Sequence, residues 1–174
     1  YWRHLVNGLK DRYRCIVPDH VGMGLSDKPD DAPGASPRYE YTLRSRIDDV
    51  DALLRHLDIS GLVTLAVHDW GGMIGFGWAL RDPARIKRLV ITTTASFPLP
   101  WQIAMGRHSR IGGWLIRRFN LFARGAAAFG TRRKLSPEVK QAYSGVYEGW
   151  SDAISTLRFM QDIPLDERDR AWSL

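Results

Sequence analysis

The sequence has very little cysteine, no long apolar run and one extended stretch without an acidic residue. Cys15 is the only cysteine, so no disulfide can form within the chain, and its apolar surroundings predict a buried, neutral thiol. A lone thiol is typical of a reducing compartment and favours the cytoplasm. No apolar run approaches the roughly 18 residues that cross a bilayer. The absence of internal repeats and low-complexity segments argues against repeat and fibrous architectures.

The first residues lack the features of a natural start. Tyr1-Trp2-Arg3-His4 has neither an initiator methionine nor the charged and apolar regions of a signal peptide. We therefore expect the true beginning of the protein to lie earlier.

Acidic residues are absent between Asp82 and Glu138, and the formal net charge is +6. This basic field can face nucleic acid, an anionic lipid surface or an acidic protein, or it can be the solvated surface of helices. No nucleic-acid partner is predicted, because the arginines accompany a strong apolar stripe and no binding motif is present. Association with a membrane surface remains open. The basic residues are Arg85, Lys87, Arg88, Arg107, Arg110, Arg117, Arg118, Arg124, Arg132, Arg133 and Lys134.

Short apolar runs alternate with helical periodicity in the first hundred residues. With 174 residues and 44% hydrophobic content, the chain is long enough to bury one core. Residues 14–17, 62–67 and 88–92 are predicted to be buried strands, and 62–67 suits a strand covered on both faces. A helix N-capped by Thr42 should run to about Leu57, and another from about Gly72 to Arg81. This alternation predicts an α/β domain with a parallel sheet.

From Trp101 to about Met160 the pattern is helical, with no convincing strand. One set of apolar residues traces a single face of an amphipathic helix. Ser136-Pro137-Glu138 is a typical helix start, and a last helix is expected from about Ser151 to Met160. A helical insertion is therefore predicted on the sheet. The apolar set comprises Ile111, Trp114, Leu115, Phe119, Phe122, Ala126 and Phe129.

Asp69 follows an apolar strand directly and precedes a helix, in the run Leu65 to Gly75. A nucleophile on so sharp a strand-to-helix turn projects above the sheet, and small residues such as Gly71 and Gly72 let the backbone fold back closely. A carboxylate there suits displacement at carbon and an ester intermediate, whereas a serine suits acyl transfer. The backbone N–H of Trp70 can stabilise an oxyanion, and its indole N–H can donate to a leaving anion. The alternative is that Asp69 only caps the following helix.

These motifs resemble those of the haloalkane dehalogenases and the related epoxide hydrolases. Val67-His68-Asp69-Trp70-Gly71-Gly72 is similar to their nucleophile turn, Pro18 to Pro29 to a loop after an early strand, and Asp82 to Val90 to a helix-to-strand connection. The resemblance implies an α/β-hydrolase fold with an inserted helical cap, present as a fragment. Residues 1–98 would form the partial core, 99–165 the cap, and 166–174 the start of the return to the core.

The segments 97–101, 119–126 and 156–165 resemble the cap of one subgroup, the β-lactone decarboxylases of bacterial long-chain olefin biosynthesis. The resemblance implies a cis-3,4-dialkyl-oxetan-2-one substrate, converted to a cis-olefin and carbon dioxide without a cofactor. It also implies an assembly with the β-lactone synthetase and other pathway enzymes at a membrane. Haloalkane dehalogenase is the alternative activity. Epoxide hydrolase, with Tyr143 or Tyr147 on the epoxide oxygen, and a non-catalytic lipid- or partner-binding scaffold are further ones.

The catalytic base and its orienting acid are expected beyond Leu174. None of the five histidines fits the base, since His68 neighbours Asp69 on a strand and points to the opposite face. His20 is interpreted as a structural hydrogen-bonding residue. The resemblance allows an acid just after the strand that precedes the cap, at residues 92–97, where this sequence has no carboxylate. We expect Phe97 and Trp101, at the opening of the cap, to bind substrate, and Trp114, Trp150 and Asp162 to serve packing or helix-end contacts.

Overall fold

The computed structural model describes residues 1–94, 109–130, 132, 134–147 and 149–163. Its first part contains α1 (Arg3–Leu9), α2 (Leu43–His56), β1 (Val63–His68), α3 (Trp70–Arg81), the short 3₁₀ helix η1 (Pro83–Arg85) and β2 (Ile86–Thr92). Its second part contains α5 (Arg110–Phe119), α6 (Leu121–Phe129), α7 (Pro137–Ser144) and α8 (Ile154–Gln161). No described helix combines the length and apolar character needed to cross a membrane.

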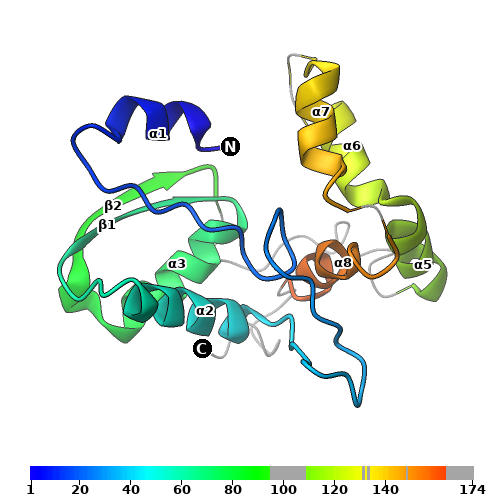
Figure 1. The fold of residues 1–174 in the computed structure, drawn as a ribbon, viewed down its shortest axis with the longest axis horizontal. Coiled ribbons are helices and arrows are strands. Elements are labelled where there is room, and N and C mark those ends of the chain that lie inside the picture. Colours follow the sequence, from blue (N-terminus) through cyan, green and yellow to red (C-terminus); the bar gives the residue numbers. More distant parts are fainter. Residues whose placement is uncertain (95–108, 131, 133, 148, 164–174) are drawn as a thin grey trace.

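The strands β1 and β2 are parallel neighbours, joined through α3 and η1. Val67 pairs with Ile91 and His68 with Thr92, so the two strands end together. In Figure 1, α2 and α3 lie on one side of the strands and α1 on the other. This arrangement confirms the predicted parallel α/β core, in which a turn at the end of β1 stands at the edge of the sheet.

The main core lies between α2, α3 and α8. Leu43, Ile47 and Leu54 of α2 pack with Ile74 and Trp78 of α3, and Phe159 of α8 completes the cluster. Ile47, Ile74 and Trp78 are all at most 2% exposed. The helical periodicity of 43–57 is thereby explained, and Thr42 caps the helix as predicted, accepting a hydrogen bond from the Ser45 amide at 3.2 Å.

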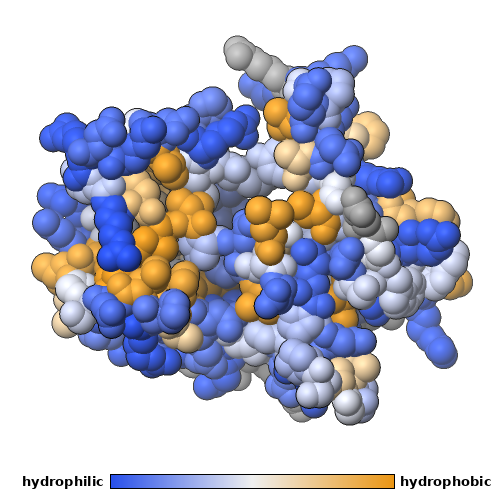
Figure 2. Space-filling view, in the orientation of Figure 1, coloured by the Kyte–Doolittle hydropathy of each residue, from blue (hydrophilic) through white to orange (hydrophobic). Residues whose placement is uncertain are grey.

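The expected burial of the strands is wrong. Only Val67 of β1 is buried, and Leu89, Val90 and Ile91 of β2 are 41–56% exposed. Figure 2 shows this hydrophobic surface gathered over the strands. In the described part of the chain the two strands pair with each other alone, and helices cover only part of their surface.

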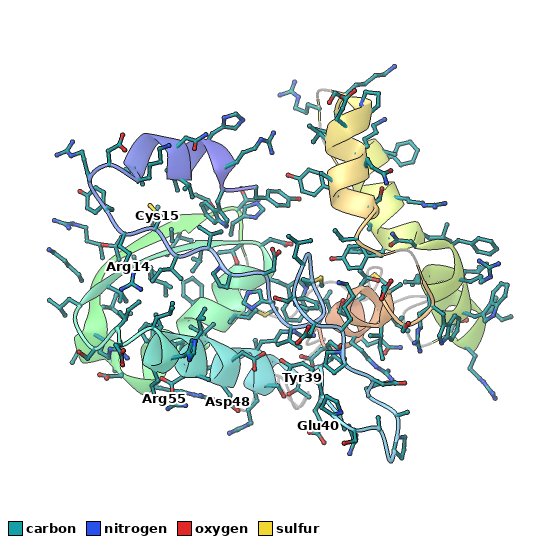
Figure 3. All side chains as sticks on the ribbon, in the orientation of Figure 1. Arg14, Cys15, Tyr39, Glu40, Asp48 and Arg55 are labelled. Atoms are coloured by element: carbon teal, nitrogen blue, oxygen red, sulfur yellow. The ribbon has the colours of Figure 1, made fainter. Side chains whose placement is uncertain are left out.

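The strand predicted for residues 14–17 is also absent, because none of these residues pairs with another strand in the described structure. An extended segment is a strand only when its N–H and C=O groups join a ladder. Cys15 lies on this segment and is half-exposed rather than buried, with its thiol 3.7 Å from the Tyr13 carbonyl oxygen. Figure 3 shows Arg14 and Cys15 on the stretch that crosses the view between α1 and the strands.

The single amphipathic helix predicted across residues 111–129 is two helices, α5 and α6. Asn120 separates them in the left-handed conformation, with φ 50° and ψ 42°. Its side chain is buried and its Nδ2 donates to the Ser144 carbonyl at 3.0 Å and the Tyr147 carbonyl at 3.3 Å. Asparagine tolerates this conformation better than most residues, so it can end one helix and begin another. The predicted start of α7 is confirmed, with Ser136 accepting from the Val139 amide.

The helix α8 joins the second part of the structure to the first. Besides Phe159 in the core, the Ser155 hydroxyl donates to the Gly22 carbonyl, and Arg158 is paired with Asp31. Gly22 has φ 85°, and an added Cβ would lie 2.4 Å from the Ser155 Cβ, so a side chain at position 22 cannot be accommodated. The Pro18–Pro29 loop is therefore packed closely against α8 and hydrogen-bonded to it.

Candidate active site

Asp69 occupies the turn between β1 and α3 with a strained backbone. Its φ is 51° and its ψ −129°, a region that non-glycine residues avoid at a cost of about 1–3 kcal/mol. Its amide donates to the Thr93 carbonyl at 2.9 Å, while its own carbonyl accepts from the Gly72 amide at 3.0 Å and the Thr94 hydroxyl at 2.5 Å. These hydrogen bonds hold the turn against the end of β2 and fix its tight backbone conformation.

The Asp69 carboxylate is exposed and is not used to cap α3. Asp69 stands at the N-cap position, yet its side chain accepts no capping hydrogen bond. It forms no ion pair with any side chain in the described ranges. The capping interpretation therefore lacks its expected contact, and the carboxylate is available to a reacting molecule.

Close packing behind the turn requires glycine at two positions. A Cβ at Gly72 would lie 1.9 Å from Thr94 Oγ1, and a Cβ at Gly75 would lie 2.6 Å from Val67 Cγ1. At Gly71, in contrast, an added Cβ would have no atom of the described residues within 4 Å, so the prediction that Gly71 must be small is wrong for this part of the chain. The sharp turn depends on Gly72, while Gly75 lets α3 approach β1.

Trp70 is half-buried at the first position of α3. Its backbone N–H is among those that an α-helix leaves without an intrahelical partner. Its ring meets the ring of Phe159 edge-on, with centroids 5.1 Å apart at 78°, and the Arg46 guanidinium carbon lies 5.4 Å from its centroid. The residue that follows Asp69 is thus packed against α8 and α2.

No described histidine is hydrogen-bonded to Asp69. His68 is beside the rings of Tyr1 and Trp2, with centroid separations of 5.2 and 6.4 Å. His20 faces the core, where its ring centroid is 6.5 Å from that of Phe159, and burial, followed by the charge of Arg46, lowers its pKa. The expected location of the catalytic base outside this chain therefore stays a prediction.

The remaining candidates fall into three groups. Phe97, Trp101 and His108 lie outside the described residues. Trp114 and Trp150 are 49% and 45% exposed, where Trp114 contacts Phe119 and Trp150 lies under Arg117 at 4.2 Å.

Two tyrosines and one aspartate have structural contacts. The Tyr147 hydroxyl accepts a hydrogen bond from the Gly24 amide at 3.4 Å, and the Tyr143 ring packs against that of Tyr1. Asp162 is at the end of α8 and pairs with Arg46 at 3.1 Å, in agreement with its interpretation as a helix-end contact.

Sequence reasoning missed Arg46 and Phe159 as neighbours of Trp70. Arg46 lies three residues after Leu43 and just before Ile47, on the apolar face of α2, where an arginine is unusual. A charged residue on the apolar face of a helix is a sequence signal for a buried contact, and it could have been recognised. Phe159 carried no such signal, because its contact with Trp70 spans 89 positions of sequence.

Groups of three or more His, Cys, Asp or Glu side chains arranged to hold a metal ion are not found among the described residues. At residue 69 and its neighbour, the structure brings together an exposed carboxylate, a backbone N–H at a helix start and a packed aromatic ring.

Comparison with known proteins finds relatives that match nearly the whole of this chain. The chain is 66% identical to a cis-3-alkyl-4-alkyloxetan-2-one decarboxylase of Xanthomonas campestris pv. campestris, over 99% of this chain and 60% of that protein. It is 49% identical to a protein of the same name from Shewanella oneidensis, over 100% of the chain and 55% of that protein. A haloalkane dehalogenase of Mycolicibacterium smegmatis is 32% identical, over 94% of the chain and 54% of that protein.

Solved structures give the same fold. The crystal structure of an ancestral haloalkane dehalogenase, AncHLD2, superposes with a TM-score of 0.85 at 24% identity, covering 99% of this chain and 61% of that one. The chain spans about 55–60% of the length of the two decarboxylases it matches. Residues 1–143 match the family described as the alpha/beta hydrolase fold. With its parallel strands and its strained turn at Asp69, this chain belongs to the α/β-hydrolase-fold family.

Proposed function

We propose that this chain provides the nucleophile of a β-lactone decarboxylase that converts a cis-3-alkyl-4-alkyloxetan-2-one into a cis-olefin and carbon dioxide. The observation that carries the proposal is the exposed, uncapped Asp69 carboxylate on its strained turn. The relatives of that name, at 66% and 49% identity, support the choice of substrate. The apolar substrate with two alkyl chains would enter beside the helices that follow residue 109.

The chemistry can be written with Asp69 as a recycled nucleophile. Its carboxylate attacks the ring carbon that bears oxygen, and the C–O bond breaks to leave an ester with Asp69 and a free carboxylate on the neighbouring carbon. Loss of carbon dioxide then breaks the C–C bond, whose electron pair forms the C=C bond and expels the Asp69 carboxylate. Inversion in the first step and anti elimination in the second convert a cis-lactone to a cis-olefin.

Trp70 has two proposed roles in these steps. Its backbone N–H, at the start of α3, would stabilise negative charge on oxygen as the ring opens. Its indole N–H would donate to the anion that leaves. Phe97 and Trp101 are proposed to contact the alkyl chains. No cofactor is part of the proposal, because both steps use only the carboxylate and the strained ring.

Replacement of Asp69 by asparagine in the full-length protein tests the nucleophile. Asparagine keeps the shape and tolerates the positive φ, but it removes the charge that attacks. Incubation with a cis-dialkyl β-lactone should yield olefin with the natural protein and none with Asp69→Asn. Asp58→Asn is the matched control, because Asp58 is also exposed and also has a positive φ, 54°. Retention of olefin formation by Asp69→Asn would remove Asp69 from the mechanism.

Haloalkane dehalogenase is the second candidate, favoured by the relative of that name at 32% identity. In that reaction Asp69 would displace halide and water would hydrolyse the ester at the carboxyl carbon, so solvent oxygen enters Asp69. The decarboxylation written above uses no water. A single turnover in water carrying a heavy oxygen isotope, followed by mass spectrometry of the peptide containing Asp69, separates the two. Bromide release from a bromoalkane gives an independent readout.

Peripheral association with an anionic membrane is proposed for α5 and α6. Ile111 and Phe129 are 73% and 90% exposed, and the same two helices carry the exposed Arg110, Arg118 and Arg124. Exposed apolar side chains beside arginines suit a lipid surface, which would also hold a substrate with long alkyl chains and the enzyme that supplies it. Sedimentation with vesicles of anionic lipid, compared with neutral vesicles, tests this association.

A further inference from the structure

Arg46 of α2 is a fully buried arginine with few partners. Its exposed fraction is 0%, and its Nη1 lies 3.1 Å from a carboxylate oxygen of Asp162. Its Nε and Nη2 are buried without a hydrogen-bond partner among the described residues. Its guanidinium carbon is 3.7 Å from the centroid of Phe159 and 5.4 Å from that of Trp70.

Stability alone does not explain an arginine at this position. Burial is the largest influence on the pKa of Arg46 and lowers it, whereas Asp162 opposes that shift. Replacing a buried ion pair by apolar residues of similar size is often neutral or stabilising. What the guanidinium adds is a directed contact, because a cation prefers the faces of aromatic rings and a planar guanidinium stacks on them.

The contacts of Arg46 connect α8 to the residue after Asp69. Asp162 and Phe159 both belong to the end of α8, and Phe159 meets Trp70 edge-on. Arg46 therefore contacts Asp162 and Phe159 at the end of α8, and it also contacts the ring of Trp70. Movement of the guanidinium would displace Phe159, and with it the surface on which the Trp70 indole rests.

We propose that Arg46, held by Asp162, is a positioning residue that fixes the Trp70 indole beside Asp69 through Phe159. This inference rests on the proposed function only for the expected effect of Arg46 on the rate of decarboxylation. The position of the indole itself can be measured in the full-length protein without substrate. Arg46 touches neither Asp69 nor the reacting atoms in this scheme, so its effect passes entirely through Trp70.

The experiment compares Arg46→Lys, Arg46→Met and Asp162→Asn with Arg55→Lys. Arg46→Lys keeps the charge but loses the planar group. Arg46→Met keeps much of the apolar volume and serves as the second variant if Arg46→Lys does not fold. Arg55 is the matched control because it also lies on α2 and also pairs with an aspartate, Asp51, but its side chain is 70% exposed. Figure 3 shows Arg55 on the side of α2 away from the strands.

The first readout is the indole N–H signal of Trp70 in a proton–nitrogen NMR spectrum, identified by its loss in Trp70→Phe. It should shift in Arg46→Lys, Arg46→Met and Asp162→Asn and stay unchanged in Arg55→Lys. An unshifted signal in the Arg46 and Asp162 variants overturns the inference, whether or not the protein decarboxylates β-lactones.

The second readout is a double-mutant cycle on kcat for the β-lactone. Arg46→Lys should lower kcat about tenfold with little change in KM, as expected for a displaced catalytic group. In a Trp70→Phe background the same change should have almost no further effect, because residues that act through one another are not additive. A full tenfold loss in that background overturns the positioning role. If Trp70→Phe alone leaves kcat unchanged, the proposed role of Trp70 fails, and the NMR signal still decides the inference.

Discussion

Two helices of the second part of the chain, α8 and α5, have opposite environments although both carry large apolar residues. In α8, residues Ile154, Leu157 and Phe159 are at most 7% exposed. In α5, Gly113 is the only buried residue, while Ile111 is 73% and Trp114 49% exposed. Helical periodicity therefore identifies an apolar face of a helix but does not say what that face packs against.

The two environments also suggest different roles for α8 and α5. The buried contacts of α8 reach the core cluster, the Pro18–Pro29 loop and, through Phe159, the residue after Asp69. The exposed faces of α5 and α6 are available for an apolar molecule or surface. Substitutions in α8 should therefore change stability and catalysis, whereas substitutions in α5 should change binding with little effect on stability.

Replacing isoleucine by alanine in each helix tests this difference most strongly. Ile154→Ala should lower the free energy of unfolding by about 2–5 kcal/mol, because it leaves a cavity in a filled site. Ile111→Ala should change it by less than about 0.5 kcal/mol. Urea unfolding of the full-length protein measures both. Equal losses would show that the α5 face is as well packed as that of α8.

Asn120, at the junction between α5 and α6, should have the next largest effect. Asn120→Ala removes two hydrogen bonds worth about 1 kcal/mol each and leaves a residue that prefers negative φ at a φ of 50°. We expect a loss of about 2–3 kcal/mol in the free energy of unfolding.

Asn120→Gly separates the two causes. Glycine loses the same hydrogen bonds but adopts positive φ freely, so its loss should be smaller by about 1 kcal/mol. Urea unfolding of both variants provides the measurement. Equal losses for alanine and glycine would show that the backbone conformation at the junction contributes nothing.

The turn at Asp69 offers a matched pair of glycines with a smaller expected effect. Gly72→Ala brings a methyl group 2.7 Å from Thr94 Cβ, a contact that rotation of the threonine side chain cannot relieve. It should cost about 1–3 kcal/mol of stability and reduce activity by shifting the turn. Gly71→Ala meets no atom of the described residues within 4 Å and should be neutral or slightly stabilising, because alanine favours a helix. Thermal unfolding distinguishes them, and a larger loss at Gly71 would contradict the described packing.

Much of the core fold could be predicted from local signals. Thr42 and Ser136 begin helices because a hydroxyl before an apolar pattern satisfies free amides, and both cap as expected. The run from Leu65 to Gly75 predicted a strand, a turn and a helix in that order, and the backbone has this order with a positive φ at Asp69.

The failures came from contacts that local patterns do not encode. Residues 14–17 have the composition of a strand, but a strand also requires a partner, which is a long-range property. The break at Asn120 was overlooked because the apolar spacing continues across it, although asparagine between two phenylalanine-containing runs was a usable signal. The pairing of Arg46 with Asp162 spans 116 positions and could not be read from either neighbourhood.

His20, in the Pro18–Pro29 loop, is a titratable residue near the buried side of α8, and its replacement should have the smallest effect. His20 packs near Phe159, and burial lowers its pKa, followed by the charge of Arg46, while Asp49 and Asp19 act in the opposite direction. The unfolded chain therefore binds more protons at this histidine than the folded protein does. The associated stability is present above its ordinary pKa of 6.5 and is lost as the pH falls below that value.

Replacing His20 by glutamine should remove this part of the pH dependence. Between about pH 7.5 and about pH 5.5, the free energy of unfolding should fall less steeply in His20→Gln than in the natural protein, as measured by urea unfolding. His56→Gln is the control, since His56 is exposed at the end of α2, and its slope should match that of the natural protein. An unchanged slope in His20→Gln would mean that His20 binds protons equally in both states, and that the surroundings of Phe159 and Arg46 are less dry than the burial of α8 indicates.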